Sequence, residues 1–256
     1  MISEQAIIHP SAKLGKNVTV GPGTVIGEGV EIGEGTWVGP HAVIEGPTVI
    51  GKNNKIFQFA SVGDEPQDTT YNGEPTKLEI GDNNVIREFT MISRGTVKGG
   101  GLTKIGNHNF LMAYTHIGHD CIVGDQNILV NYSALSGHVI IEDYVTIGAY
   151  AAVHQFCNVG SYAFIARATY VTKDVIPYVM IAGHTTSACG INTVGLRRRG
   201  FSSDSINALR RAYKVIFRKG LTVEHAVTEL KVMSEDCVEI EPLIEALKKA
   251  TRGIVR

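Results

Sequence analysis

The chain has 256 residues, of which 43% are hydrophobic, and its 24 basic and 25 acidic side chains give a formal net charge of -1. This length suits one large domain or two of moderate size, with enough apolar residues for a packed core. No stretch approaches the roughly 18 uninterrupted apolar residues of a membrane span, and the N-terminal MISEQAIIHPSA does not resemble a signal peptide. We therefore expect a cytoplasmic protein without integral membrane association.

Most of the chain follows a repeat of six. Every sixth residue is aliphatic from Ile2 to Val62, from Ile80 to Ile92 and from Ile105 to Val171, and many of these residues precede a glycine. A phase of six fits neither a 3.6-residue helix nor an alternating strand. It is typical of a parallel β-helix, whose short strands each point one branched side chain inward while glycine permits the geometry of the corner. Three hexads make one coil, so residues 18 apart should stack at about 4.8 Å.

Two segments interrupt the repeat, residues 64–77 and 93–104, and both are rich in turn-forming residues. We expect them to project from the coil as loops. Such excursions from a regular rod often form interfaces or the walls of a binding site, although a tolerated surface insertion has the same sequence pattern.

The repeat stops at Pro177, and helix signals follow. Ser202 or Ser203 can cap a first helix, Thr222 a second, and Pro242 suits the first turn of a third. We therefore predict a β-helix over residues 1–190 and a small α-helical C-terminal domain over residues 191–256.

The predicted helical domain is the basic part of the chain. Residues 197–256 hold 13 basic and 8 acidic side chains, whereas residues 1–196 hold 11 and 17. The excess favours an acidic partner or a phosphate group, although a solvated helix face explains part of it. We do not expect nucleic acid as the partner.

The cysteines and histidines differ in arrangement. The cysteines are scattered without a CxxC pair, which favours reduced thiols, and no structural metal or other cofactor is expected from them. The histidines instead include four within 39 residues of the repeat: His116, His119, His138 and His154.

The 18-residue rule groups some of these histidines with other reactive groups. It places His119 one coil from Gly137 and Asp120 one coil from His138. A base, a carboxylate that orients it and a bare backbone N–H for an oxyanion are what acyl transfer to a hydroxyl needs. No serine or cysteine lies in an obvious nucleophile motif, which favours direct transfer. Adjacent residues of a flat strand point to opposite sides, so Asp120 can hold His119 only if the corner turns it back.

Two other interpretations of the histidines remain. Each one alone could be a hydrogen-bonded surface or interface residue. Together, imidazoles from one or two subunits could bind zinc, as in the hexapeptide-repeat carbonic anhydrases. The three-residue step from His116 to His119 does not resemble the ligand spacing of that family, so we predict no metal site.

Several motifs together resemble the bacterial acyl-(acyl-carrier-protein)–UDP-N-acetylglucosamine O-acyltransferases, which catalyse the first step of lipid A synthesis. They span the chain as PQDTTYNGEPT, RGTVKGGGLT, THIGHDC, LSGHV, AVHQFC and GLRRRGFS. The resemblance implies a left-handed β-helix and a homotrimer with active sites in the clefts between subunits. It also implies transfer of a 3-hydroxyacyl chain from acyl carrier protein, an acidic partner, to the glucosamine 3-position of UDP-N-acetylglucosamine.

By match of motif, the resemblance makes His119 the general base, Asp120 its partner and Gly137 the oxyanion donor. The remaining assignments concern substrate binding: His116, His138, His154 and Gln155 would line the cleft, Gln67 and Asp68 would contact the sugar, and Asn192, Arg198 and Arg199 would contact the nucleotide and its phosphates.

Three residues depart from the family pattern. Thr70 stands where well-known members have a lysine that contacts substrate, and Val194 stands where some have a glutamate near the nucleotide. Arg167 stands where a small residue or a methionine helps to limit acyl length in the family. An arginine there could shorten the pocket or redirect the acyl chain, so the sequence does not predict the preferred length. The alternative function is a non-catalytic hexapeptide-repeat scaffold that binds a nucleotide sugar or carrier protein. The acceptor could carry a 3-hydroxyl or a 3-amine. The related N-acyltransferases of the same pathway are a further alternative, but they have an additional N-terminal uridine-binding domain that is not seen in this sequence.

Overall fold

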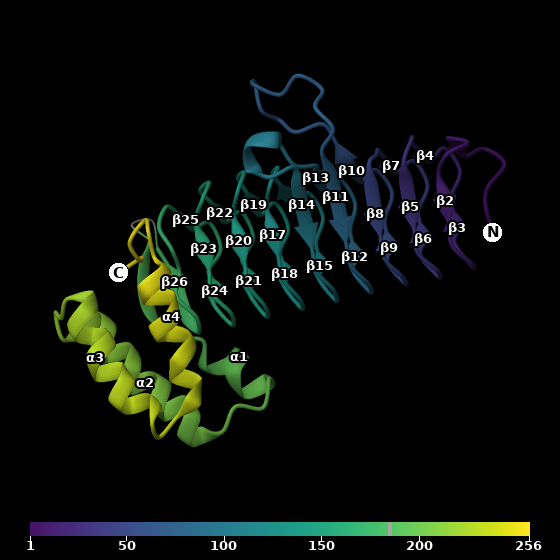
Figure 1. Cartoon of the computed structure of the whole chain (residues 1–256). Helices are drawn as coiled ribbons and strands as arrows, with labels where there is room; N and C mark the ends of the chain where they lie inside the picture. The colour runs from purple at the N-terminus through teal and green to yellow at the C-terminus, as the bar shows by residue number, and fades with distance from the viewer. Residues whose placement is uncertain (184–185) are drawn as a thin grey trace.

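The computed structural model describes residues 1–183 and 186–256, and its strands wind into a three-sided prism (Figure 1). The strands are short and form three sheets. The first sheet contains β1 (Ile7–Ile8), β4 (Val25–Ile26), β7 (Val43–Ile44), β10 (Ser61–Asp64), β13 (Met91–Ser93), β16 (His116–Ile117), β19 (Ala134–Leu135), β22 (Ala152–Val153) and β25 (Tyr170–Val171). The second contains β2 (Lys13–Leu14), β5 (Val30–Ile32), β8 (Thr48–Ile50), β11 (Lys77–Ile80), β14 (Leu102–Ile105), β17 (Ile122–Val123), β20 (Ile140–Ile141) and β23 (Asn158–Val159). The third contains β3 (Thr19–Val20), β6 (Trp37–Val38), β9 (Lys55–Ile56), β12 (Val85–Ile86), β15 (Phe110–Leu111), β18 (Ile128–Leu129), β21 (Thr146–Ile147), β24 (Phe164–Ile165), β26 (Val179–Ala182) and β27 (Ser187–Ile191).

Pairing in these sheets confirms that the six-residue repeat forms a parallel β-helix, with three hexads in each coil. From β1 to β22, each strand pairs in parallel with the strand three places further on, so that Ile117 lies beside Leu135 and Leu135 beside Val153. These three side chains are fully buried in the core. Burial of such a side chain contributes about 1.5–3 kcal/mol, so the ladder of inward aliphatics holds the prism together. The antiparallel pair β26 and β27 ends the third sheet.

Most corners use glycine differently from our expectation. The backbone turns at the fourth residue of a hexad, counted from its inward aliphatic residue. Glycine takes the left-handed conformation there at Gly23, Gly29 and Gly35, but in most hexads a non-glycine residue such as Asp120 (φ 61°) or Tyr132 (φ 61°) does so. The glycine that follows an inward aliphatic residue instead allows the next coil to approach. A Cβ on Gly118, for example, would lie 2.9 Å from the amide nitrogen of Gly137. Close stacking of coils, rather than a positive φ, is therefore the reason for glycine at this position.

We name the corners by the sheet whose strands precede them. The first corner includes residues 118–121, 136–139 and 154–157, the second includes 124–127 and 142–145, and the third includes 112–115, 130–133, 148–151 and 166–169. The two predicted loops leave the coil between β10 and β11 and between β13 and β14, and they project side by side from the prism (Figure 1). The second loop contains a short 3-10 helix, η1 (Val97–Gly99).

Helices cover the C-terminal end of the prism. They are α1 (Thr193–Arg198), α2 (Ser203–Arg218), α3 (Val223–Ser234), the 3-10 helix η2 (Val238–Ile240) and α4 (Glu241–Lys249). Ser202 and Thr222 cap α2 and α3 through their hydroxyls, and Pro242 lies in the first turn of α4, as predicted. The sequence did not reveal α1, which is only six residues long. Among the described residues, no helix combines the length and apolar character needed to cross a bilayer.

Candidate active site

His119 and Asp120 form a hydrogen-bonded pair at the first corner. The Nδ1 of His119 lies 2.7 Å from Oδ2 of Asp120. The positive φ of Asp120 turns its side chain back toward the residue before it, which a flat strand would not do. The carboxylate is buried, whereas the imidazole is partly exposed. Because the carboxylate accepts a hydrogen bond from Nδ1–H, Nε2 is the nitrogen left without a proton and can accept one.

The second projecting loop fixes the Asp120 carboxylate. Thr96 donates its backbone N–H to Oδ1 and its hydroxyl to Oδ2, both at 2.7 Å. The amide N–H of Asp120 is in turn donated to the hydroxyl of Thr103 at 2.8 Å. Gly99 packs so closely that a Cβ there would lie 2.0 Å from Cγ of Asp120. None of these three residues could be located from the sequence, because the loop breaks the spacing of 18 that located Asp120.

Gly137 lies against the imidazole of His119. A Cβ at this position would be 2.6 Å from Cε1 and 2.7 Å from Nε2 of His119, so no side chain fits between the two residues. Within the part of the chain that the structure describes, the Gly137 N–H has no hydrogen-bond acceptor. The predicted stacking therefore brings the free imidazole nitrogen beside an available peptide donor.

The other histidines surround this pair. The ring of His138 lies edge-on to that of His119, with centroids 5.1 Å apart, and its Nε2 is 3.7 Å from Oδ2 of Asp120. Burial lowers the pKa of His138, against the opposing effect of Asp120. Burial also lowers the pKa of His116, and the charge of His119 adds to the decrease. Both rings are thus favoured in the neutral form.

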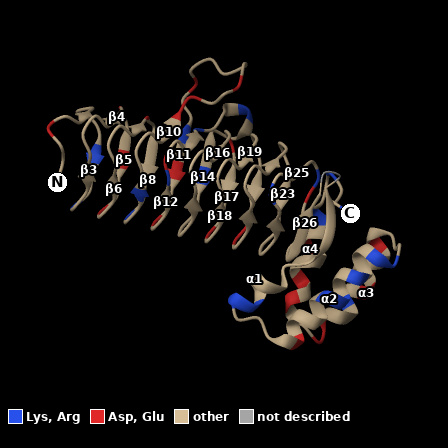
Figure 2. Cartoon of the chain, turned by 180° about the vertical axis from the view of Figure 1, so that it is seen from behind, with Lys and Arg blue, Asp and Glu red and all other residues tan. Residues whose placement is uncertain are grey.

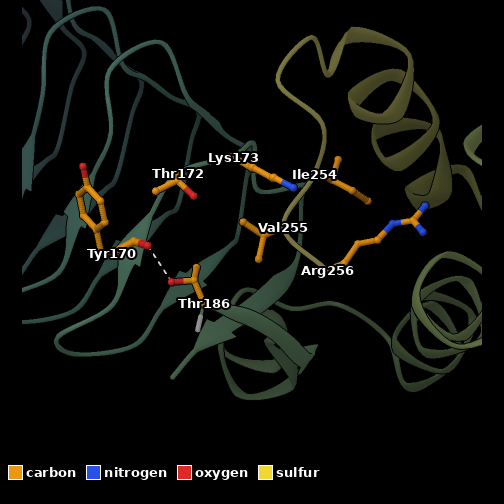
Figure 3. A pocket seen from close by; sticks show the side chains of 7 residues that line it. All are labelled: Tyr170, Thr172, Lys173, Thr186, Ile254, Val255 and Arg256. Carbon is orange, nitrogen blue, oxygen red and sulfur yellow. Dashed lines mark hydrogen bonds between the residues drawn. The ribbon is translucent and has the colours of Figure 1, made fainter. Parts of the chain in front are cut away.

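A column of outward side chains runs along the first sheet, next to the first corner, toward the C-terminal end of the prism. The outer faces of β16, β19, β22 and β25 stack His116, Ala134, Ala152 and Tyr170 in one column. His154 lies on this edge, with its ring centroid 6.2 Å from that of Tyr170 and Nδ1 3.1 Å from the Gln155 carbonyl oxygen. At the end is a cavity of about 390 Å³ (Figure 3). Its lining is Tyr170, Thr172, Lys173, Thr186, Ile254, Val255 and Arg256.

The first projecting loop reaches the same edge. Gln67 lies 2.8 Å through Nε2 from the sulfur of Met91, which pairs with His116 on the next strand. Asp68 accepts hydrogen bonds from the backbone and hydroxyl of Thr70, and these bonds lower the pKa of its carboxyl. Thr70 carries no charge, but it accepts a hydrogen bond from the ammonium group of Lys98 at 2.8 Å.

The remaining predicted residues lie on or next to α1, or at another corner of the same chain. Asn192 caps α1 through its side chain, and the exposed Arg198 lies in the last turn of that helix. Arg199 stacks over Tyr144 at 4.6 Å and donates a hydrogen bond to Gln126 at the second corner. Arg167 and Val194 are exposed, Arg167 at the third corner and Val194 on α1. A single chain therefore does not bring these residues to His119.

A metal ion could be considered at His119, Asp120 and His138, whose potential ligand atoms all lie within 4.8 Å of one another. However, Oδ2 of Asp120 already accepts hydrogen bonds from both His119 and Thr96, and Oδ1 accepts one from Thr96. These bonds suit a carboxylate that orients a histidine better than one that coordinates a cation, so our prediction of no metal remains in place.

Comparison with known proteins gives a consistent result along the chain. Residues 29–64 and 102–137 match the bacterial transferase hexapeptide model, and residues 174–255 match domain 2 of UDP N-acetylglucosamine O-acyltransferase. The acyl-(acyl-carrier-protein)–UDP-N-acetylglucosamine O-acyltransferase of Stutzerimonas stutzeri is 48% identical over 100% of this chain and 99% of its own. The Pseudomonas aeruginosa protein of the same name is 50% identical over the same shares.

Solved structures agree with the sequence relatives. LpxA from Acinetobacter baumannii superposes with a TM-score of 0.98 at 50% identity, over 100% of this chain and 99% of its own. The UDP-N-acetylglucosamine acyltransferase of Francisella novicida gives 0.97 at 46% identity, over 100% and 94%. The prism is therefore a left-handed β-helix followed by helices, as predicted.

Proposed function

The chain belongs to the acyl-(acyl-carrier-protein)–UDP-N-acetylglucosamine O-acyltransferase family, and we propose that it carries out this reaction with His119 as the general base. It transfers an acyl chain from acyl carrier protein to UDP-N-acetylglucosamine. The acyl group is a 3-hydroxyacyl chain, the acceptor is the 3-hydroxyl of the glucosamine unit, and the product enters lipid A synthesis. The observation that supports this best is Nε2 of His119 beside the N–H of Gly137, neither of which has a hydrogen-bond partner among residues 1–183 and 186–256.

The residues divide the chemistry as follows. Nε2 of His119 accepts the proton of the acceptor hydroxyl as its oxygen attacks the thioester carbonyl carbon. The negatively charged oxygen that forms is stabilised by the N–H of Gly137, while Asp120 stabilises the imidazolium through Nδ1. Collapse of the tetrahedral intermediate breaks the carbon–sulfur bond, and the imidazolium returns the proton to the leaving thiolate. No covalent enzyme intermediate is formed.

The remaining predicted side chains bind the substrates. Gln67 and Asp68 contact the sugar, and His116, His138, His154 and Gln155 line the cleft. Asn192, Arg198 and Arg199 contact the nucleotide and its phosphates. The exposed Arg167 limits the acyl chain. The carrier protein docks on α2, where Arg210, Lys214 and Arg218 line a cavity of about 390 Å³; Figure 2 shows basic residues on α1 and α2. Opposite charge on an acidic carrier would accelerate its association.

A homotrimer would bring the separated residues together. Arg198 and Arg199 are near the second corner, whereas His119 is at the first, so a neighbouring subunit is needed to supply one set. The third corner carries a stacked column of exposed rings, which indicates an interface. The column consists of Phe59, Phe89, Tyr114, Tyr132 and Tyr150. The chain's free cysteines suit the reducing cytoplasm, where we place the reaction.

The test is an assay of the purified protein with UDP-N-acetylglucosamine and a panel of hydroxyacyl carrier proteins. His119→Ala should leave a folded protein whose transfer rate falls by about 100-fold or more. His108→Ala is the matched control, because His108 is an exposed histidine at another left-handed corner. Absence of turnover with every donor, despite binding of the nucleotide sugar, would instead favour the non-catalytic scaffold. The same panel reports acyl length and whether a 3-amine acceptor is used.

The shared site can be tested separately. When His119→Ala and Arg199→Ala chains are co-expressed, random assembly in a trimer leaves about a quarter of the clefts with both native residues. Activity should therefore reappear in the mixture although each variant alone is inactive. A mixture as inactive as its components, with mixed trimers shown by mass spectrometry, would contradict the shared site.

A further inference from the structure

Lys98 occupies a fixed place beside the proposed base. It is the central residue of η1, and residues on both sides of it, Thr96 and Gly99, contact Asp120. Thr96 donates two hydrogen bonds to that carboxylate, and Gly99 packs directly against it. The backbone of Lys98 is therefore held relative to the His119–Asp120 pair, although its side chain is exposed.

The ammonium group of Lys98 spans the two projecting loops. Its Nζ donates to the hydroxyl of Thr70 at 2.8 Å, and that hydroxyl donates to Oδ1 of Asp68 at 2.9 Å. The charges of both His119 and Lys98 contribute to the lowered pKa of Asp68, after the hydrogen bonds from Thr70. Asp68 therefore lies within electrostatic reach of the base and of the lysine.

This ammonium group has unused binding capacity. Within the described ranges 1–183 and 186–256, Lys98 forms no ion pair with a carboxylate, and Thr70 is its one hydrogen-bond partner. A lysine ammonium has three N–H donors, so two remain for a ligand. A compact charge on a flexible stem is suited to a phosphate group.

We propose that Lys98 binds the diphosphate of the nucleotide-sugar acceptor, supported by the Thr70 hydroxyl. This inference rests on the proposed function, in which Gln67 and Asp68 of the same loop hold the sugar. The diphosphate is bonded directly to that sugar, so a cation beside Asp68 is well placed to meet it. Beside Asp68, the first projecting loop offers only the uncharged Thr70. The positive charge comes from Lys98 of the second loop, whose ammonium group contacts the Thr70 hydroxyl.

The experiment compares Lys98→Met with Lys98→Arg in the full chain. Binding of UDP and of uridine is measured by calorimetry, and KM is measured for acceptor and donor. Lys98→Met should weaken UDP binding and raise the acceptor KM by about 10-fold, the scale of a charge-assisted hydrogen bond. Uridine binding and the donor KM should stay within about 2-fold, and Lys98→Arg should recover most of the affinity. Lys104→Met is the control, because Lys104 is an exposed lysine on the following strand β14.

Three outcomes would overturn the proposal. Unchanged UDP affinity in Lys98→Met would exclude a contact with the acceptor's phosphates, and a change confined to the donor KM would assign the lysine to the acyl donor. If Lys98→Arg, which keeps the positive charge, did not recover UDP affinity, the charge at this position would not be what binds the phosphates. Because UDP binding needs no turnover, these results are independent of whether His119 acts as the base.

Discussion

The Asp120 carboxylate holds His119 through a 2.7 Å contact to Nδ1 although the two residues are adjacent in sequence. This contact selects the tautomer whose Nε2 can accept a proton. In Asp120→Asn, the side-chain oxygen can still accept from Thr96, but an amide N–H can then face Nδ1. The imidazole would carry its proton on Nε2, and the acyl transfer rate should fall by about 100-fold or more.

Steady-state kinetics and thermal melting of the Asp120→Asn protein measure this effect. Asp125→Asn is a matched control, because Asp125 accepts a hydrogen bond from the Asn107 amide at the second corner, away from His119. We expect the control to change the rate by less than about 2-fold. A folded Asp120→Asn protein of full activity would show that the carboxylate does not set the tautomer.

Gly137→Ala should separate catalysis from folding. Gly137 is not among the residues with positive φ, so alanine meets no backbone penalty there. Its Cβ would instead lie 2.6 Å from Cε1 of His119 and must displace the imidazole. A misplaced base should reduce kcat by about 100-fold. Gly27→Ala is the control, because its Cβ would meet only the flexible end of Glu45, and it should retain the native rate. Equal activity in the two variants would contradict the close contact between Gly137 and His119.

The parts that follow the repeat could be predicted from sequence, because stacking at 18 residues depends only on local geometry. This rule located His119 beside Gly137 and Asp120 beside His138. It failed where the chain leaves the coil. Thr96, which holds Asp120, is 24 residues away from it. Contacts of this kind depend on how a loop packs back onto the coil, and residue spacing carries no signal for that.

Acid should destabilise the fold through the partly buried histidines. Burial lowers the pKa of His116 and of His138 in the folded chain, whereas an unfolded histidine titrates near 6.5. Below that pH the unfolded state binds more protons, so stability is greatest above about pH 6.5 and decreases as pH falls toward the folded pKa values. Melting temperature measured from pH 7.5 to 5.5 should therefore fall, and His116→Gln should make it fall less. His108→Gln, at an exposed corner, is the control; an identical pH slope in native protein and His116→Gln would contradict this origin.

The inward ladder makes a prediction about stability alone. Ile117, on β16, is fully buried inside the prism, whereas Ile122, on the next strand β17, is 37% exposed. Ile117→Ala leaves a cavity that the stacked neighbours cannot close, so the free energy of unfolding should fall by about 2–5 kcal/mol. Ile122→Ala removes the same atoms from an outward position and should cost about 0.5 kcal/mol. Denaturant unfolding followed by circular dichroism measures both. Equal losses would mean that the hexad does not separate inward from outward positions, and the stacking that places His119 beside Gly137 would lose its basis.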